Sequence, residues 1–221
     1  MKGKRTYGGV AASEREANRR AQLLDAGLEL LGTEGYNGTT VRAVCVQAKL
    51  TPRYFYESFA DLDSLLLAVF DEIADELATE ILKAVMPPPG DATQTARAAI
   101  AAGVQTLTAD LRKARVLFIE ALGSEALAER RRQTLRGFAS LVAAQGGAFY
   151  GVSSSEDRLI ELSSLMLVGG LAEAFAAWLD GTVPVTEEQL IEDCTALFVA
   201  AGETAARLAG GRSSGAKRAR P

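Results

Sequence analysis

Two short apolar stripes, separated by only two residues, most constrain how this chain can fold. The first covers about residues 40–48, and the second begins at Thr51 and Pro52 and ends near Phe59. A threonine cap followed by proline at the first helical position favours a new helix here. Helices this short bury too little apolar surface to be stable alone. The segment 40–59 therefore predicts a helix-turn-helix packed on neighbouring helices.

The flanking sequence supplies those neighbours. Upstream, Ser13 and Glu16 form the pattern of a capping box, and apolar residues then recur at helical spacing until about residue 31. Downstream, Asp61 can cap a long fourth helix, which the run Pro87-Pro88-Pro89-Gly90 stops.

The rest of the chain continues as helices. Hydrophobic residues make up 48% of the sequence, and alanine and leucine dominate over β-branched and aromatic residues. We therefore expect an all-α fold of about nine helices, with breaks at glycine and proline. The later five are expected at about 92–109, 111–122, 125–149, 156–180 and 187–208. The expected division is a flexible basic arm at 1–12, a helix-turn-helix domain at 13–60, a larger helical domain at 61–209 and a disordered basic tail at 210–221.

Charge is distributed unevenly along the chain. The net charge is −4, yet residues 1–58 hold nine Lys/Arg against six Asp/Glu. Residues 59–211 hold eleven against twenty-two, and residues 212–221 add four basic residues and no acidic ones. Because phosphate repels an acidic surface, any contact with DNA is expected in the N-terminal quarter.

The second short helix has a distinct outward face. Phe55 and Phe59, spaced i and i+4, are expected to point into the domain. The outward residues are then Arg53, Tyr54, Tyr56 and Glu57. Arginine is the usual bidentate reader of guanine, and tyrosine hydroxyls commonly contact phosphates. This face therefore predicts a recognition helix for the major groove of DNA.

Residue types match a known family in order and spacing across three helices. The matching positions are Gly35, Tyr36, Thr39, Thr40, Val41, Val44, Ala48, Leu50, Thr51, Phe55, Tyr56, Phe59 and Leu65. Over about residues 14–70 this pattern resembles the tetracycline-repressor (TetR) family. The segment Trp178 to Gly181 also resembles the end of that family's penultimate helix. The resemblance implies a DNA-binding domain joined by the fourth helix to a ligand-binding and dimerisation domain.

The resemblance also assigns roles to particular residues. DNA contacts are implied for Thr40, Arg42, Thr51, Pro52, Arg53, Tyr54 and Tyr56. Three positions depart from the family pattern: Lys49 replaces the usual turn glycine, Glu57 stands where a phosphate-friendly residue is frequent, and Leu62 replaces a common lysine. Lys49 must either adopt a strained φ or sit in a slightly different turn. The arm residues Lys2, Lys4 and Arg5 would compensate for lost phosphate contacts.

For the larger domain the resemblance implies a cavity among the middle helices and a homodimer through the last two helices. Candidate ligand-binding residues are Phe118, Glu120, Phe138, Phe149 and Met166. For the aromatic and methionine side chains, the pattern favours plain core packing over ligand contact. Glu120 either orients a cationic or hydroxylated ligand or pairs with Arg115 or a surface group. The run 130–132 of three arginines is either a solvated charge run or an entrance for acidic ligands such as acyl-CoA.

Other classes of protein receive little support. The chain contains no histidine and no P-loop, GxSxG, HExxH or dinucleotide motif, so we expect no enzyme, no catalytic residue and no cofactor. Cys45 and Cys194 stand apart and are expected to be core residues in a reducing compartment, with no metal site. No apolar run appears long enough for a membrane span, so a cytoplasmic location is expected.

The sequence thus predicts a ligand-responsive transcriptional regulator. We expect a repressor that binds double-stranded DNA at a palindromic operator as a homodimer and is released by a small-molecule effector. Two alternatives stay open. One is a helical interaction module that has lost DNA binding, which Lys49, Glu57 and Leu62 would favour. The other is a DNA-binding regulator that has a filled core and no inducer.

Overall fold

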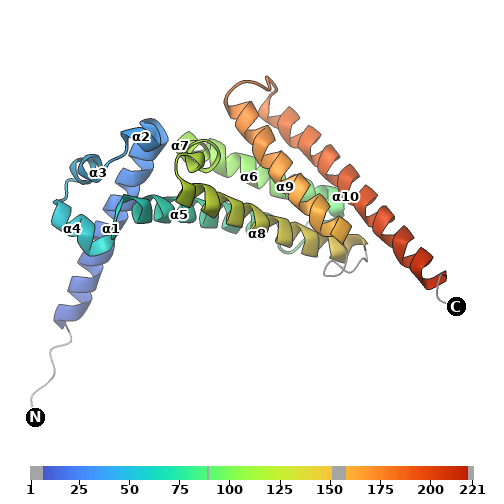
Figure 1. Cartoon of the computed structure of the whole chain (residues 1–221), viewed down its shortest axis with the longest axis horizontal. Coiled ribbons are helices and arrows are strands. Elements are labelled where there is room, and N and C mark those ends of the chain that lie inside the picture. The colour runs from blue at the N-terminus through green and yellow to red at the C-terminus, as the bar shows by residue number, and fades with distance from the viewer. Residues whose placement is uncertain (1–6, 89, 151–157, 219–221) are drawn as a thin grey trace, which may run out of the picture. The chain divides into compact units, whose positions relative to one another are not determined.

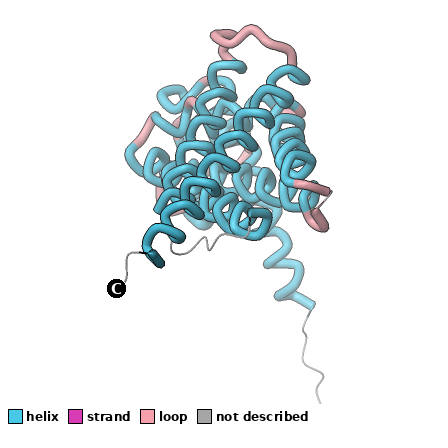
Figure 2. Tube along the Cα trace, turned by 90° about the vertical axis from the view of Figure 1, so that its right-hand side faces the viewer, coloured by secondary structure: helices cyan, strands magenta, loops and turns pink. Residues whose placement is uncertain are grey.

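The computed structural model describes residues 7–88, 90–150 and 158–218. Throughout these residues the chain forms helices and loops and no strand (Figure 2). The α-helices are α1 (Tyr7–Thr33), α2 (Gly35–Gly38), α3 (Val41–Gln47), α4 (Pro52–Ser58), α5 (Leu62–Val85), α6 (Ala92–Thr108), α7 (Leu111–Phe118), α8 (Glu125–Tyr150), α9 (Arg158–Leu179) and α10 (Glu187–Arg218), and a 3₁₀ turn, η1, covers Glu120–Leu122 (Figure 1). The expected all-α class is confirmed, with the short α2 as an addition to the expected helices.

Two helices extend beyond their predicted bounds. α1 begins at Tyr7, so Ser13 lies inside the helix and the predicted capping box there is wrong. α10 continues to Arg218, beyond the end expected near residue 208. Glycines in both extensions weaken a helix by about 1 kcal/mol each, but neither extension contains a proline that would end it. Residues 1–6 and 219–221, with Lys2, Lys4 and Arg5 of the arm, lie outside the described residues.

Reciprocal caps begin two of the long helices. The Ser64 amide donates to Asp61 Oδ1 over 2.8 Å, and the Asp61 amide donates to Ser64 Oγ over 3.1 Å. The hydrogen bonds from Ser64 hold the pKa of the Asp61 carboxyl below its usual range. Asp91 and Gln94 form a capping box at the start of α6. The predicted cap at Asp61 is confirmed, and both caps satisfy amides that a helix start leaves without partners.

The chain divides into two compact units. The first contains the residues up to Ala74 and the segment Leu111–Arg130, and the second contains Asp75–Asp110 and the residues from Arg131 onward. α5 and α8 each contribute residues to both units because each helix contains one of these boundaries.

The first unit is built around α1, which packs against α2, α3, α4 and α7. Its fully buried side chains include Leu23, Leu31, Val44, Phe55, Leu65 and Leu66. Each such side chain contributes about 1.5–3 kcal/mol by leaving water. This common core holds the short helices α3 and α4, which would not persist alone.

Polar contacts fasten α7 and η1 to the end of α1. Arg112 forms an ion pair with Glu29 on α1. Arg115 donates from Nε to Glu120 Oε1 over 3.0 Å and from a terminal nitrogen to the Thr33 carbonyl over 3.1 Å. The Tyr36 amide donates to Glu120 Oε2 over 2.8 Å. The Glu120 carboxylate therefore joins Arg115 of α7 to the backbone of α2.

The second unit is held by contacts of α10 with α6 and α9. Arg97 of α6 pairs with Glu188 of α10, and Arg131 of α8 pairs with Glu173 of α9 over 2.8 Å. At the α9–α10 turn the Trp178 indole donates to the Val185 carbonyl over 2.9 Å. These contacts connect four helices of this unit.

Gly32 tests the close packing of α1 against α7. A Cβ at Gly32 would lie 2.5 Å from Arg112 Cβ, a contact that requires the helices to shift. We expect Gly32→Ala to lower the free energy of unfolding by about 1–3 kcal/mol, measured by urea denaturation of the full chain. The matched control is Gly137→Ala in α8, where a Cβ meets nothing within 4 Å. Equal effects of the two substitutions would contradict the close crossing.

Candidate nucleic-acid interface and apolar cavity

The turn between α3 and α4 is a Schellman motif with a lysine in the left-handed position. The Leu50 amide donates to the Cys45 carbonyl over 2.9 Å, and the Lys49 amide donates to the Val46 carbonyl over 3.1 Å. Lys49 has φ of 55°, a conformation that usually favours glycine. Of the two alternatives for Lys49, the strained φ is therefore confirmed. Burial raises the pKa of the Cys45 thiol, as expected for a core cysteine.

The orientation of α4 is fixed by two phenylalanines. Phe55 is fully buried and Phe59 is 5% exposed, and their ring centroids lie 5.9 Å apart. The inward direction predicted for both side chains is confirmed. Because these rings occupy the inner face of α4, its other face remains outside. The outward residues at the turn and on α4 are Thr51, Pro52, Arg53, Tyr54 and Tyr56, all of them exposed.

α3 presents the other two predicted contacts. Arg42 is exposed near the start of the helix. Thr40 caps α3, since its Oγ1 accepts a hydrogen bond from the Ala43 amide over 3.1 Å. Thr51 precedes α4 without a capping hydrogen bond from its side chain. All seven residues predicted to contact DNA thus lie at the surface of one helix-turn-helix.

Glu57 does not stand alone on this surface. Its carboxylate accepts a hydrogen bond from Arg53 Nε over 3.0 Å and lies 3.9 Å from a guanidinium nitrogen of Arg19. Arg19 also stacks on the Tyr54 ring, with Cζ 4.6 Å from the ring centroid. The acidic departure at Glu57 is therefore offset by two arginines. Exposed ion pairs of this kind are weak, so the Arg53 guanidinium can exchange Glu57 for another partner.

Sequence reasoning missed the part that α1 plays in this surface. Arg20 stacks on Phe59, with Cζ 4.4 Å from the ring centroid, and its guanidinium lies 3.5 Å from the Ser58 carbonyl oxygen. Together with Arg19 it adds two basic side chains beside α4. The signal available in the sequence was the Arg19-Arg20 pair within the first helix. Leu62, the third departure, is half-buried in the first turn of α5.

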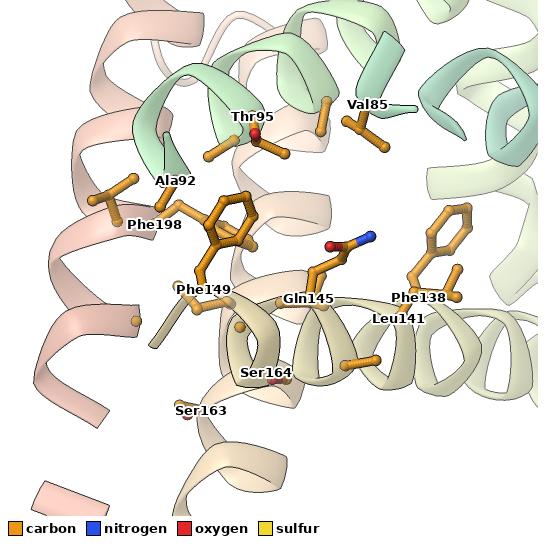
Figure 3. A pocket seen from close by; sticks show the side chains of 18 of the residues that line it. Val85, Ala92, Thr95, Phe138, Leu141, Gln145, Phe149, Ser163, Ser164 and Phe198 are labelled. Carbon is orange, nitrogen blue, oxygen red and sulfur yellow. The ribbon is translucent and has the colours of Figure 1, made fainter. Parts of the chain in front are cut away.

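The second unit contains a cavity of about 250 Å³. Its wall is formed by residues of α5, α6, α8, α9 and α10. Of the predicted ligand-binding residues, Phe138 and Phe149 of α8 line it (Figure 3). The other three are not part of its wall.

Each of those three side chains has a different environment. Phe118 and Glu120 belong to the first unit, whereas the cavity lies within the second. The Glu120 side chain is 12% exposed and is satisfied by Arg115 and the Tyr36 amide, so the alternative pairing with Arg115 is confirmed. Met166 is 69% exposed on α9. The spacing of residues along a helix could not predict that these three side chains lie outside the cavity wall. It does not specify which neighbouring helix each face of a helix packs against.

Sequence reasoning also missed several wall residues. Thr95 of α6, Gln145 of α8 and Phe198 of α10 line the cavity (Figure 3). A signal was present in α6, where Ala92, Ala96 and Ala99 place small side chains at helical spacing. Such a stripe leaves space beside the helix unless a neighbour fills it.

The arginine run has structural partners. Arg130 lies 3.5 Å from Asp71 within the first unit. Arg131 pairs with Glu173 within the second unit, and its side chain is only 15% exposed. The run is therefore not simply a solvated face, and none of its three residues lines the cavity.

α9 combines an apolar sequence with little burial. Over 22 residues it reaches a mean hydropathy of 1.6 in its most apolar window, and only 28% of that window is buried within the chain. By length and composition the helix could cross a membrane, although one such helix is weak support for a membrane span. Its exposed side chains include Leu162, Leu165 and Met166.

The geometry of α3, α4 and their turn defines a helix-turn-helix DNA-binding domain. The family model described as bacterial regulatory proteins, tetR family, matches residues 23–69, which include both helices. Residues 23–69 of the chain therefore match the DNA-binding domain of the tetR family of bacterial regulatory proteins. The resemblance noted in the sequence is confirmed.

Solved structures share the fold across most of the chain. The fatty acid degradation regulator FadR from Bacillus halodurans is 20% identical, with a TM-score of 0.68 over 81% of this chain and 94% of that one. FadR from Bacillus subtilis in complex with stearoyl-CoA is 18% identical, with a TM-score of 0.61 over 84% and 97% of the two chains. A TetR-like regulator from Rhodococcus sp. RHA1 is 19% identical, with a TM-score of 0.62 over 83% and 93%. No curated protein matches the sequence.

Lys49 allows a direct test of the strained turn. We expect Lys49→Gly to raise the free energy of unfolding by about 1 kcal/mol relative to Lys49→Ala, because only glycine adopts a positive φ without steric cost. The two variants remove the same charge, so urea denaturation of both isolates the backbone effect. Equal stabilities would contradict the left-handed conformation at this residue.

Proposed function

We propose that this regulator represses transcription by binding a palindromic operator as a homodimer. The observation that carries the proposal is the outward face of α4, fixed by the burial of Phe55 and Phe59. On this face the Arg53 side chain is 83% exposed, and Tyr54 and Tyr56 lie beside it. Arg53 would read guanine in the major groove, while the tyrosines and Arg42 would hold phosphates.

A homodimer provides the second recognition helix. The exposed apolar side chains of α9 and α10, including Leu162, Met166 and Leu197, form a surface that water solvates poorly. A second copy of the chain covering these helices would bury it. Two-fold symmetry would then place two copies of α4 about 34–36 Å apart, the separation of successive major grooves on one side of DNA.

The cavity supports regulation by a small molecule. Its wall contains Ala78, Ile81 and Val85 of α5, and the same helix supplies Leu65 and Leu66 to the core of the DNA-binding unit. A ligand that shifts α5 would therefore alter the affinity for the operator. Such coupling is reciprocal, so operator DNA would weaken ligand binding by the same factor.

The related FadR structures add to this proposal. The Bacillus subtilis protein was solved with stearoyl-CoA bound, so this fold can accommodate a small-molecule effector. A regulator that binds DNA and a diffusible effector acts in the cytoplasm. The cavity also disfavours the variant in which the protein has a filled core and no inducer.

The proposal is tested by binding of the purified full chain to DNA flanking its own coding region. Fluorescence anisotropy at two salt concentrations should reveal saturable binding that weakens steeply as salt is raised. A palindromic competitor selected from that region should displace the labelled DNA, whereas random DNA should not. Absence of any preference over random DNA would favour the alternative of an interaction module that has lost DNA binding.

Arg53→Ala tests the recognition face. We expect it to weaken operator binding by about 1–3 kcal/mol and to relax specificity at one base pair, because a bidentate guanine contact is lost. The control is Lys83→Ala, which removes an exposed basic side chain in the second unit. A loss that is uniform across DNA sequences would instead assign Arg53 to phosphate.

Leu197→Glu tests the dimer surface. Leu197 is 71% exposed on α10, so a charge there costs little in a single chain but would be desolvated in the dimer. We expect the variant to sediment as a monomer at micromolar concentration and to lose operator affinity. Leu122→Glu, at a leucine that is 64% exposed in η1, is the control. An unchanged dimer in Leu197→Glu would place the interface elsewhere.

A further inference from the structure

The side chains that line the cavity of the second unit indicate what it can hold. Its described wall residues are alanines, larger aliphatic residues, phenylalanines and a few neutral polar residues, and none of them carries a charge. An ionised ligand group inside would lose its hydration without gaining a partner of opposite charge. The wall therefore favours an uncharged occupant.

The wall of the cavity extends along α8. In Figure 3 Phe138 lies well to the right of Phe149 along the wall. They are eleven residues apart on α8, which corresponds to about 16 Å along the helix axis. The volume of about 250 Å³ exceeds that of an engineered cavity of roughly 150 Å³ that binds benzene. An elongated molecule larger than a single ring fits these dimensions.

One fully buried polar atom of the described wall has no hydrogen-bond partner. Thr95 is 8% exposed, and its Oγ1 is buried with no hydrogen bond. Gln145 belongs to the facing wall, on α8 (Figure 3). The Ser163 hydroxyl, by contrast, already donates to the Leu159 carbonyl over 2.6 Å. A buried hydroxyl without a partner costs free energy, which a ligand oxygen within hydrogen-bond distance of Thr95 Oγ1 would recover.

We propose that this cavity binds an uncharged, elongated hydrophobic molecule that carries one hydroxyl or carbonyl oxygen, with Thr95 as the residue that recognises this oxygen. The inference rests on the proposed regulation by a small molecule and specifies the class of effector. It excludes effectors whose ionised group must lie inside the cavity.

A series of ten-carbon probes tests the charge of the ligand. Decanol and methyl octyl ketone are neutral, decanoate is anionic, decylammonium is cationic, and decane lacks the polar group. Isothermal titration calorimetry with the full chain, in the absence of DNA, should show tighter binding of the two neutral oxygen-containing probes than of the ions. Decanoate or decylammonium binding as tightly as decanol would overturn the proposal, as would no binding of either neutral probe.

Two substitutions test the role of Thr95. Thr95→Val keeps the shape and removes the hydroxyl, so the affinity for decanol should fall about tenfold while that for decane stays unchanged. Thr95→Ser keeps the hydroxyl and should retain the preference for decanol over decane. Equal decanol affinity in wild type and Thr95→Val would refute recognition by this residue.

Operator release is measured separately by adding decanol to the DNA complex. Binding of decanol without release would support the ligand class and count against the proposed regulation. Release with the expected charge preference would support both. The two proposals can therefore fail independently.

Discussion

The burial of Phe55 is the interaction on which the DNA-binding surface depends. α4 has only seven residues and cannot hold its orientation by its own backbone hydrogen bonds. With Phe55 fully buried and Phe59 nearly so, the rotation of α4 about its axis is determined by the core of the first unit. Arg53 and Tyr56 therefore face outward as a consequence of this packing. Their outward direction needs no further contact to fix it.

A second constraint joins this domain to α7. The Glu120 carboxylate lies against the turn between α1 and α2, where Gly35 has φ of 75° and a Cβ would approach Glu120 Oε2 to 3.0 Å. Glycine is therefore needed twice over, for its backbone conformation and for the space it leaves. Because Arg115 and the Tyr36 amide satisfy this carboxylate, Glu120 stabilises the first unit, and it does not line the apolar cavity among α5, α6, α8, α9 and α10.

The local patterns in the sequence predicted the elements well. Helical spacing, the cap at Asp61 and the break at the proline run were sufficient for the all-α class, and the i, i+4 pair Phe55 and Phe59 predicted which face of α4 is exposed. The cavity was predicted poorly because its wall depends on which helices meet. Phe138 and Phe149 line it, but Phe118 and Met166 are equally apolar and do not. Thr95 escaped notice because a threonine in a helix carries no signal until its hydroxyl proves to lack a partner.

The central claim, that the packed orientation of α4 makes this chain a sequence-specific DNA reader, is tested most directly by selection from a random DNA pool with the purified protein. The account predicts enrichment of one palindromic motif whose half-sites are separated by about one helical turn of DNA. Enrichment that follows no common sequence, or no retention of DNA even at low salt, would contradict it.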